Sequence, residues 1–392
     1  MKLSRRISKT ELSATIAMSM KARELKAQGR DILALTAGEP DFDTPDFIKD
    51  AAIAAIKEGK TKYTPVDGTK TLKNAIINKF KKENNLSYVE DEIIVSAGCK
   101  QSIYNLCQAY LEEGDEVLIP GPCWVSYPEI VKLSGANPII IKTKPENNFK
   151  LDKETLERSI NSKTKMIMIN SPCNPTGAVY TKNELSEICS VLKKYENILI
   201  ASDDIYEHII FNGEKFYNIL SICPELKDRT VILNGVSKAY AMTGWRIGYT
   251  AGNIKIINAM KKIQSQSTSC PCSIAQYAAE EALNNTSYDI SHMVKEYKAR
   301  ADFLYESLNK IEGVVYTETN GAFYAFPNVS GLIKNLKNVT NDSELCEYLL
   351  ENAGVAVVPG SSFGVENHVR ISFATSLANL DEAISRIKKA SK

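Results

Sequence analysis

One stretch in the middle of the chain decides the fold: residues 166–202, which read MIMINSPCNPTGAVYTKNELSEICSVLKKYENILIAS. The stretch begins and ends with short apolar runs, Met166–Asn170 and Ile198–Ser202, of the length expected for buried strands. Between them, Lys182–Lys194 carries apolar residues at helical spacing. A strand, a helix and a second strand in this order form two parallel strands joined by a crossover helix. The stretch therefore predicts a parallel sheet covered by helices.

The same alternation extends in both directions, from about residue 90 to residue 252. A helical pattern at Gln101–Leu111, for example, follows the first of the additional strands. Alternating strands and helices favour an α/β fold whose mainly parallel sheet is flanked by helices on both faces. The additional strands are predicted at Glu92–Val95, Glu116–Ile119, Pro138–Ile141, Thr230–Leu233 and Ile247–Ala251.

The two ends of the chain have a different pattern. Residues 11–28 form one amphipathic helical pattern, which is followed by a short apolar run at Ile32–Leu35. Near the other end, a long helical pattern at Glu296–Lys310 precedes several short strands and a closing helix. Those strands are predicted at Val314–Thr317, Ala322–Phe326, Val355–Val358 and Val369–Ser372.

With 392 residues, the chain is long enough for about two domains. We expect a large ligand-binding domain over residues 46–287. The smaller α+β domain is expected to combine residues 1–45 with residues 288–392, because only these two segments lack the regular alternation.

Composition and charge exclude several classes of function. The net charge of +1 gives no basic surface for nucleic acid or for a membrane. No apolar run approaches the ~18 residues of a membrane-spanning helix, and the basic N-terminus lacks the apolar segment of a signal peptide. Nine cysteines without a framework spacing suit the reducing cytoplasm, where we expect the protein to reside. The three histidines have no metal-ligand spacing, so no metal site is expected.

In open α/β sheets, ligands bind beyond the carboxyl ends of the strands. The strand that ends at Val95 is followed by small residues that open a helix, with Gly98, Cys99 and Lys100 among them. Free N–H groups at such a helix start attract a phosphate. After the next strand comes Trp124, an aromatic side chain at the same edge of the sheet.

The remaining strand ends add an amide, a carboxylate, a phenol, a hydroxyl and two cations. Each of these groups alone is a weak signal, but together they match one cofactor. Pyridoxal phosphate needs a lysine for its Schiff base, a carboxylate at its pyridine nitrogen, an aromatic cover and a phosphate site. A dehydrogenase would instead need the dinucleotide glycines, which the sequence lacks. The groups are those of Asn174, Asp203, Tyr206, Ser237, Lys238 and Arg246.

Residues 235–248, GVSKAYAMTGWRIG, resemble the lysine-attachment signature of class I aminotransferases position by position. Three further motifs occur in that family's order and spacing, and a fourth lies near the start of the chain. The resemblance covers essentially the whole chain and is greatest with bacterial aspartate aminotransferases of subgroup Ib. The motifs are Asn174–Gly177 (NPTG), Asp203–Tyr206 (DDIY), Val369–Ala374 (VRISFA) and Thr36–Phe42 (TAGEPDF).

The resemblance implies a role for each residue at the cofactor. Lys238 holds pyridoxal phosphate and then carries a proton to and from the substrate. Asp203 pairs with the pyridinium nitrogen, since an anion within hydrogen-bond reach favours the charged ring. Tyr206 and Asn174 bind the phenolic oxygen, and Trp124 stacks on the ring.

The phosphate site is also implied by the resemblance. Tyr63 reaches the phosphate of the neighbouring subunit, which makes a homodimer with shared active sites the functional unit. Animal-type aspartate aminotransferases have a serine where Gly235 stands, so one phosphate contact of that type is missing or replaced here. The remaining phosphate contacts are assigned to the backbone of Gly98, Cys99 and Lys100 together with Ser237 and Arg246.

The substrate contacts complete the assignment that the resemblance implies. Arg370 binds the α-carboxylate with its planar guanidinium, and Gly38 lets the backbone approach the same carboxylate. Lys100 occupies the position of the subgroup Ib lysine that binds a second carboxylate, with Ser13 and Thr15 as helpers. Trp124 and Asn174 contact the substrate as well as the cofactor.

We therefore expect transfer of the amino group of L-aspartate or L-glutamate to a 2-oxo acid such as 2-oxoglutarate, by a ping-pong mechanism. The nearest alternative is the same reaction with prephenate, an aromatic amino acid or alanine, because the choice of a dicarboxylate depends on Lys100. A second alternative is a lyase that uses the same cofactor to break a C–S bond. A regulator with a degenerate enzyme domain would need a DNA-binding module, for which the chain has no spare domain.

Overall fold

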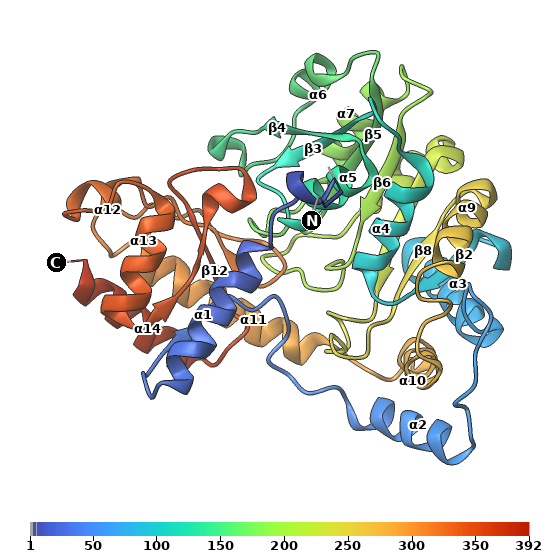
Figure 1. Ribbon diagram of the computed structural model, residues 1–392, viewed down its shortest axis with the longest axis horizontal. Coiled ribbons are helices and arrows are strands. Elements are labelled where there is room, and N and C mark those ends of the chain that lie inside the picture. The colour runs from blue at the N-terminus through green and yellow to red at the C-terminus, as the bar shows by residue number, and fades with distance from the viewer. Residues whose placement is uncertain (1–2, 5, 392) are drawn as a thin grey trace.

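The computed structural model describes residues 3–4 and 6–391, so residues 1, 2, 5 and 392 of the expected domains lie outside the described part. Its largest feature is a seven-stranded sheet, with strand order β2-β8-β7-β6-β5-β3-β4 (Figure 1). Strand β8 runs antiparallel to both of its neighbours, and the pairs among β3 to β7 are parallel. The strands are β2 (Ile93–Ser96), β3 (Glu116–Gly121), β4 (Asn137–Lys142), β5 (Thr164–Asn170), β6 (Leu199–Asp203), β7 (Thr230–Gly235) and β8 (Gly248–Ala251).

The central strands are apolar along their whole length because both faces of the sheet are covered. In β5, Met166 and Met168 pack into one hydrophobic core, whereas Ile167 and Ile169 pack into another. Successive side chains of a strand point to opposite faces, so one continuous apolar run supplies two cores. The α/β fold class predicted from the sequence is confirmed, and each predicted strand of this sheet begins and ends within two residues of the observed one.

Helices flank the sheet and connect its strands. Helix α4 packs against α5 and α9, and α10 packs against α2 and α3. Among the described residues, no helix is both long enough and apolar enough to cross a membrane. The helices of this part are α2 (Asp46–Lys57), α3 (Lys70–Asn84), α4 (Cys99–Tyr110), α5 (Ser126–Ser134), α6 (Lys153–Ser159), α7 (Lys182–Leu192), α8 (Ile219–Ile222), α9 (Ile254–Ser265) and α10 (Ser273–Asn284).

The two ends of the chain come together beside the large sheet. Strand β1 (Leu33–Ala34) pairs in parallel with β10 (Val355–Ala356), and Figure 1 shows α1 next to the C-terminal helices. A second small sheet has the order β11-β12-β9. Its strands are β9 (Tyr324–Ala325), β11 (Val358–Pro359) and β12 (Val369–Ser372), and the helices are α1 (Ala14–Ala27), α11 (Ser291–Leu308), α12 (Ser330–Asn335), α13 (Asp342–Tyr348) and α14 (Leu377–Ala390).

Two strand predictions in this part were wrong. In the described structure Val314–Thr317 forms no strand, since Val315 makes only an isolated bridge to Asn328 and is itself exposed. The run Val355–Val358 is divided, because its first half pairs with β1 and its second half begins β11, which pairs with β12. Both errors concern pairing between distant segments, which an apolar run does not specify.

Candidate active site

A pocket with a volume of about 300 Å³ lies where the large sheet meets the segments from the two chain ends. Ligand sites of this size are common in enzymes. The pocket gathers most of the side chains singled out from the sequence. Those that line it are Thr15, Gly38, Cys99, Lys100, Trp124, Asn174, Asp203, Tyr206, Ser237, Lys238, Arg246 and Arg370.

Lys238 follows strand β7, and its Nζ donates a hydrogen bond to the carbonyl oxygen of Gly38. Burial lowers the pKa of Lys238 to about 8; the carboxylate of Glu39 opposes this shift, and the positive charges of Arg246 and Arg370 add to it. A buried amine with a lowered pKa is neutral, and therefore nucleophilic, in a larger fraction of molecules near pH 7. Lys238 is thus suited to bond a carbonyl carbon and to carry a proton.

Asp203 is the last residue of β6, and its carboxylate is buried. Tyr127 Oη donates to its Oδ2 at 2.5 Å, and the N–H of Ile205 donates to its Oδ1 at 3.2 Å. Burial nevertheless raises the pKa of Asp203 to about 6. Across residues 3–4 and 6–391, no ion pair within 4.0 Å involves this carboxylate. A cationic ring nitrogen in the pocket would supply the missing charge.

An anion cradle lies at the start of α4. Gly98 precedes the helix with φ of 85°, and a Cβ built on it would come within 2.1 Å of Nη2 of Arg246. Arg246 Nη1 in turn donates to the carbonyl oxygen of Thr243 at 2.7 Å, which fixes the guanidinium beside the helix start. Free N–H groups and a guanidinium at one helix start form a site for a phosphate.

Two neighbouring residues bear on this cradle. The thiol of Cys99 lies 4.0 Å from Oδ1 of Asp203, and burial raises its pKa well above the ordinary value, so it stays neutral. At Gly235, a Cβ would lie 2.9 Å from the carbonyl oxygen of Ile247. Strand β7 packs too closely on β8 for a serine at this position, and Arg246 approaches the helix start instead.

Arg370, on β12, is 1% exposed. Its Nη1 donates to Oδ1 of Asn174 at 3.0 Å, and its Nη2 donates to the carbonyl oxygen of Thr36 at 2.7 Å. Within the described part of the chain, Nε has no hydrogen-bond partner and no carboxylate pairs with the guanidinium. A buried cation held by neutral groups is costly unless an anion joins it. Arg370 therefore marks a carboxylate site.

Two tyrosines that line the pocket, Tyr127 and Tyr324, were not anticipated from the sequence. Tyr324 Oη lies 2.9 Å from Tyr206 Oη, and the guanidinium of Arg370 lies 4.5 Å from the Tyr324 ring. Tyr127, the donor to Asp203, lies on α5. Neither tyrosine belongs to a sequence motif. Tyr127 reaches the pocket because of its position on the face of α5, and Tyr324 reaches it because β9 pairs with β12 in the small sheet.

Lys100 and Trp124 also line the pocket and contact each other. Lys100 Nζ lies 4.8 Å from the centre of the Trp124 ring, which is a cation–π contact. Burial lowers the pKa of Lys100, and the charge of Arg246 lowers it further. Thr15 Oγ1 is buried here without a hydrogen-bond partner in the described structure. Lys100 and Thr15 thus leave a cation and a hydroxyl available to a ligand.

Three residues predicted for the site lie outside the lining of the pocket within this chain. Gly98 lies behind the lining and contacts it through Arg246. Ser13 is the residue before α1, two positions from Thr15. Tyr63 is 91% exposed and is not among the residues that line the pocket of its own subunit.

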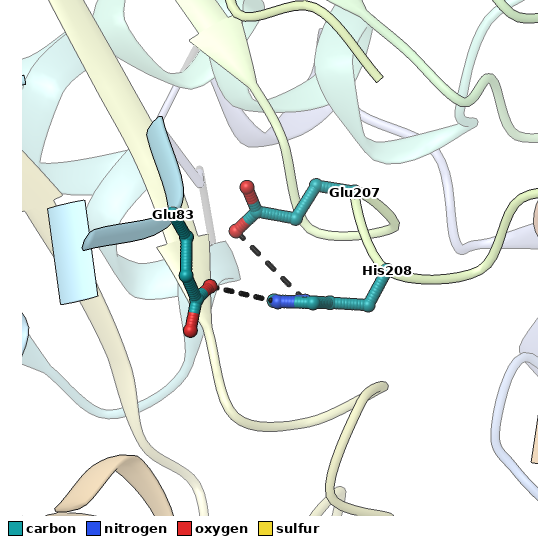
Figure 2. A group of neighbouring side chains, drawn as sticks. All are labelled: Glu83, Glu207 and His208. Carbon is teal, nitrogen blue, oxygen red and sulfur yellow. Dashed lines mark hydrogen bonds and ion pairs between the residues drawn. The ribbon is translucent and has the colours of Figure 1, made fainter. Parts of the chain in front are cut away.

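A second cluster of ionisable groups lies behind the site and comprises Glu83, Glu207 and His208 (Figure 2). His208 Nε2 lies 2.9 Å from Glu83, and its Nδ1 lies 3.9 Å from Glu207. The ammonium of Lys79 contacts Glu207 directly and lies 3.5 Å from Glu83. Because a lysine already supplies the positive charge, we assign this cluster to stability rather than to metal binding.

Comparison with known proteins gives one consistent result. Residues 30–387 match the model of the family "Aminotransferase class I and II". The chain is 53% identical over 392 residues to an aspartate/prephenate aminotransferase of Nitrosomonas europaea, covering 99% of both chains. It is 48% identical to an aspartate aminotransferase of Bacillus sp. strain YM-2, covering 99% of this chain and 98% of the other.

Two solved structures are similarly close. The aspartate aminotransferase of Rhizobium meliloti has a TM-score of 0.96 at 43% identity, covering 100% of this chain and 99% of the other. The aspartate aminotransferase of Thermus thermophilus with maleate has a TM-score of 0.94 at 42% identity, with 100% of both chains covered.

Proposed function

Because the chain belongs to the class I and II aminotransferases, we propose that it transfers the amino group of L-aspartate or L-glutamate to a 2-oxo acid such as 2-oxoglutarate, with pyridoxal 5'-phosphate at Lys238. One observation carries the choice of substrate. Besides the amine of Lys238 and the guanidinium of Arg246 at the phosphate cradle, the pocket contains two further cations, Arg370 and Lys100, for two carboxylates. The named relatives that act on aspartate support the same choice.

The pocket fits the proposed cofactor at both of its charged ends. Asp203 is a buried carboxylate without an ion pair in the described structure, and the start of α4 with Arg246 is a cradle for a phosphate. When bound, pyridoxal phosphate supplies an electron sink that makes the Cα proton of an amino acid easier to remove. Asp203 then stabilises positive charge at the ring nitrogen.

Lys238 moves the proton in this proposal. Its Nζ takes the proton from the substrate Cα, and it can do so because burial holds its pKa near 8 rather than above 10. Tyr206 and Asn174 would hold the phenolic oxygen of the cofactor through hydrogen bonds. Trp124, packed edge-on against Tyr127 at 5.3 Å, covers one face of the pocket and excludes water.

The two carboxylates of the substrate are held by two separate sets of residues. Arg370 offers its unpaired Nε, with Asn174 and Gly38 beside it, to the α-carboxylate. Lys100 and Thr15 hold the second carboxylate, with Ser13 at the start of the same helix as a helper. Two fixed carboxylates would orient the Cα–H bond toward Lys238, which lines the same pocket.

We further propose a homodimer whose active sites are shared. Tyr63 is 91% exposed, and Ile53 and Ile56 on the helix before it are about half exposed, at 48% and 53%. Exposed apolar side chains grouped in one region indicate an interface. Tyr63 of the partner subunit would complete the phosphate site. The cytoplasm is the proposed location, since all nine cysteines are free. The division into residues 46–287 and the two chain ends remains part of the proposal.

The test is a half-reaction screen without any 2-oxo acid. Each amino acid is added to the loaded enzyme, and the aldehyde absorbance of the cofactor is followed. Aspartate and glutamate should react fastest, and Lys238→Ala should abolish the reaction. Faster reaction with alanine or an aromatic amino acid would reject the dicarboxylate assignment. Release of pyruvate and ammonia in equal amounts would indicate a lyase instead.

The role of Lys100 is tested by Lys100→Ala. Loss of one charge-assisted contact should lower kcat/KM for aspartate about tenfold to a hundredfold. The rate with alanine, which has no second carboxylate, should change less than threefold. Lys82→Ala, an exposed lysine on α3, is the control. An equal loss for both amino acids would show that Lys100 serves the cofactor and not the substrate.

A further inference from the structure

Two buried glutamines lie next to the exposed loop of residues 62–69, which carries Tyr63. Gln264 on α9 and Gln276 on α10 are both 0% exposed. A buried amide is costly unless its donors and acceptor are all paired. The partners of these two side chains therefore show what the amides are for. Three of the six partners belong to this loop, and the other three are Asn105, Val95 and Pro271.

Gln276 holds the loop at two points on either side of its turn. Its Oε1 accepts a hydrogen bond from the N–H of Thr69 at 2.8 Å, and its Nε2 donates to Thr64 Oγ1 at 2.9 Å. The same Nε2 also donates to the carbonyl oxygen of Pro271 at 3.0 Å. Thr64 directly follows Tyr63, so the hydrogen bond from Gln276 holds the chain one residue away from Tyr63.

Gln264 ties the loop to the start of the phosphate cradle. Its Nε2 donates to the carbonyl oxygens of Val66, at 2.5 Å, and of Val95, at 2.8 Å. Val95 lies on β2, three residues before Gly98. The N–H of Val95 also donates to the carbonyl oxygen of Asp67 at 3.0 Å. The loop that carries Tyr63 is thus fixed to β2, the strand that leads into the phosphate cradle of the same subunit.

Packing adds to these hydrogen bonds. Gly68 has φ of 103°, and a Cβ built on it would lie 2.5 Å from the side chain of Val95, so the loop backbone lies directly on β2. Asp67 is held by Lys73 at 2.8 Å and by Lys261 at 3.1 Å. A loop with this many buried contacts has little freedom, although Tyr63 itself is 91% exposed.

We propose that Gln276 is a positioning residue for the active site of the partner subunit: it fixes the loop that presents Tyr63 to the phosphate bound there. This inference rests on the proposed dimer with shared sites. A flexible tyrosine would lose conformational entropy on each contact, whereas a pre-ordered one does not. Gln264 has the same role and in addition couples the loop to the cradle of its own subunit.

The proposal predicts an effect on phosphate binding. Thr64→Val keeps the shape of the side chain and removes the hydrogen bond to Gln276. It should weaken binding of pyridoxal phosphate to the apoenzyme about fivefold to tenfold, and inorganic phosphate similarly. Binding of pyridoxal, which has no phosphate, should not change. Thr71→Val is the matched control, because Thr71 also bonds α10, through Glu280 at 2.6 Å, but lies outside the loop.

Hybrid dimers decide in which subunit the residue acts. One subunit carries Lys238→Ala, so the only active site of the hybrid is in the other subunit, and it receives Tyr63 from the Lys238→Ala subunit. Gln276→Met, or Thr64→Val if the first variant folds poorly, is placed in either subunit in turn. Cofactor affinity should fall when it is placed in the Lys238→Ala subunit and stay within twofold when it is placed in the active one.

The same hybrids with Tyr63→Phe separate the two proposals. If Tyr63→Phe has no effect from the Lys238→Ala subunit, the shared site itself is rejected. If Tyr63→Phe acts across the dimer but the Gln276 and Thr64 variants act only within their own subunit, or not at all, the positioning role is rejected. Equal losses from both placements would also reject it, since they would indicate a general loss of stability.

Discussion

Asp203 ends strand β6, and Glu207 lies four residues later in the turn that follows; both carboxylates are buried, but their pKa values shift in opposite directions. Although burial acts to raise it, Lys79 and His208 hold the pKa of Glu207 at about 2. Asp203 forms no ion pair in the described structure, and burial raises its pKa to about 6 although its hydrogen bonds and the charge of Lys238 oppose the rise. Asp204, between them, is a third case, because burial and the charge of Glu207 raise its pKa well above the ordinary value.

The difference separates a carboxylate that the fold itself pairs from one that we propose serves a ligand. Glu207 is paired by the fold itself, with further hydrogen bonds from Asn84 at 2.8 Å and from Asn234 at 2.5 Å. Asp203 lines the pocket, so its missing charge can come from a ligand. Where a fold leaves a pocket carboxylate buried and without a cation, we infer that the ligand brings the cation.

The largest effect on the free energy of unfolding is expected when the ion pair between Lys79 and Glu207 is broken. Lys79→Met leaves Glu207 buried without its cation, which should lower the free energy of unfolding by about 4 kcal/mol. Lys82→Met, on the exposed face of the same helix, should change it by less than about 0.5 kcal/mol. Urea unfolding of both variants measures the difference. Equal stability of the two would show that the buried pair contributes nothing.

Substitution of Asp203, which lines the pocket, should lower the catalytic rate. Asp203→Asn removes the charge that stabilises a cationic ring nitrogen, and it should lower kcat about 300-fold, within the range measured for single electrostatic contacts to a transition state. Steady-state kinetics with aspartate measure it. The opposite variant, Glu207→Gln, should leave kcat within threefold in the fraction that folds. A larger loss of kcat from Glu207→Gln than from Asp203→Asn would reverse the assignment.

The two carboxylates also predict opposite dependences of apoenzyme stability on pH. The pKa of Glu207 is lowered, so its contribution is present above about pH 4.3 and is lost as pH falls toward 2. The pKa of Asp203 is raised, so its protonated form favours folding below about pH 3.9, and that contribution is lost as pH rises through 6. Each change amounts to about 3 kcal/mol.

Unfolding free energies of the apoenzyme at several pH values test this. Asp203→Asn should remove the loss of stability between pH 4 and pH 6, and Glu207→Gln should remove the loss below pH 4. If neither variant changes the dependence of the unfolding free energy on pH, the pKa shifts of Asp203 and Glu207 do not control the stability of the apoenzyme.

Much of the site was predictable because parallel strands place their carboxyl ends at one edge. Lys238, Asp203 and Asn174 each follow a strand, and the spacing of their motifs brings them to a common pocket. Tyr127 was missed because the orientation of α5 decides which of its side chains face the pocket. Tyr324 was missed because its position depends on the pairing of two strands that are distant in the sequence. The contact that we propose for Tyr63 would depend on a second subunit, so a single chain does not show it.

The absence of strand Val314–Thr317 has the same origin as the missed tyrosines. An apolar run shows that a segment can form a strand, but only a neighbouring edge makes it one. Lys79 and Lys238 show that the sequence does not predict the electrostatic environment of a charged residue. Both are single lysines in the sequence, and only the structure reveals that one neutralises a carboxylate while the other has its pKa lowered.

The most direct test of the central claim compares apoenzyme and cofactor-loaded enzyme at pH 7, in the original chain and in Asp203→Asn. The unpaired carboxylate costs about 3 kcal/mol, and the variant gives up one hydrogen bond of about 1 kcal/mol. We therefore predict that apo Asp203→Asn is about 2 kcal/mol more stable than the apo original chain. Saturating pyridoxal phosphate should remove or reverse that gap. Equal stabilities of the two apo forms, or a gap that the cofactor leaves unchanged, would contradict the account.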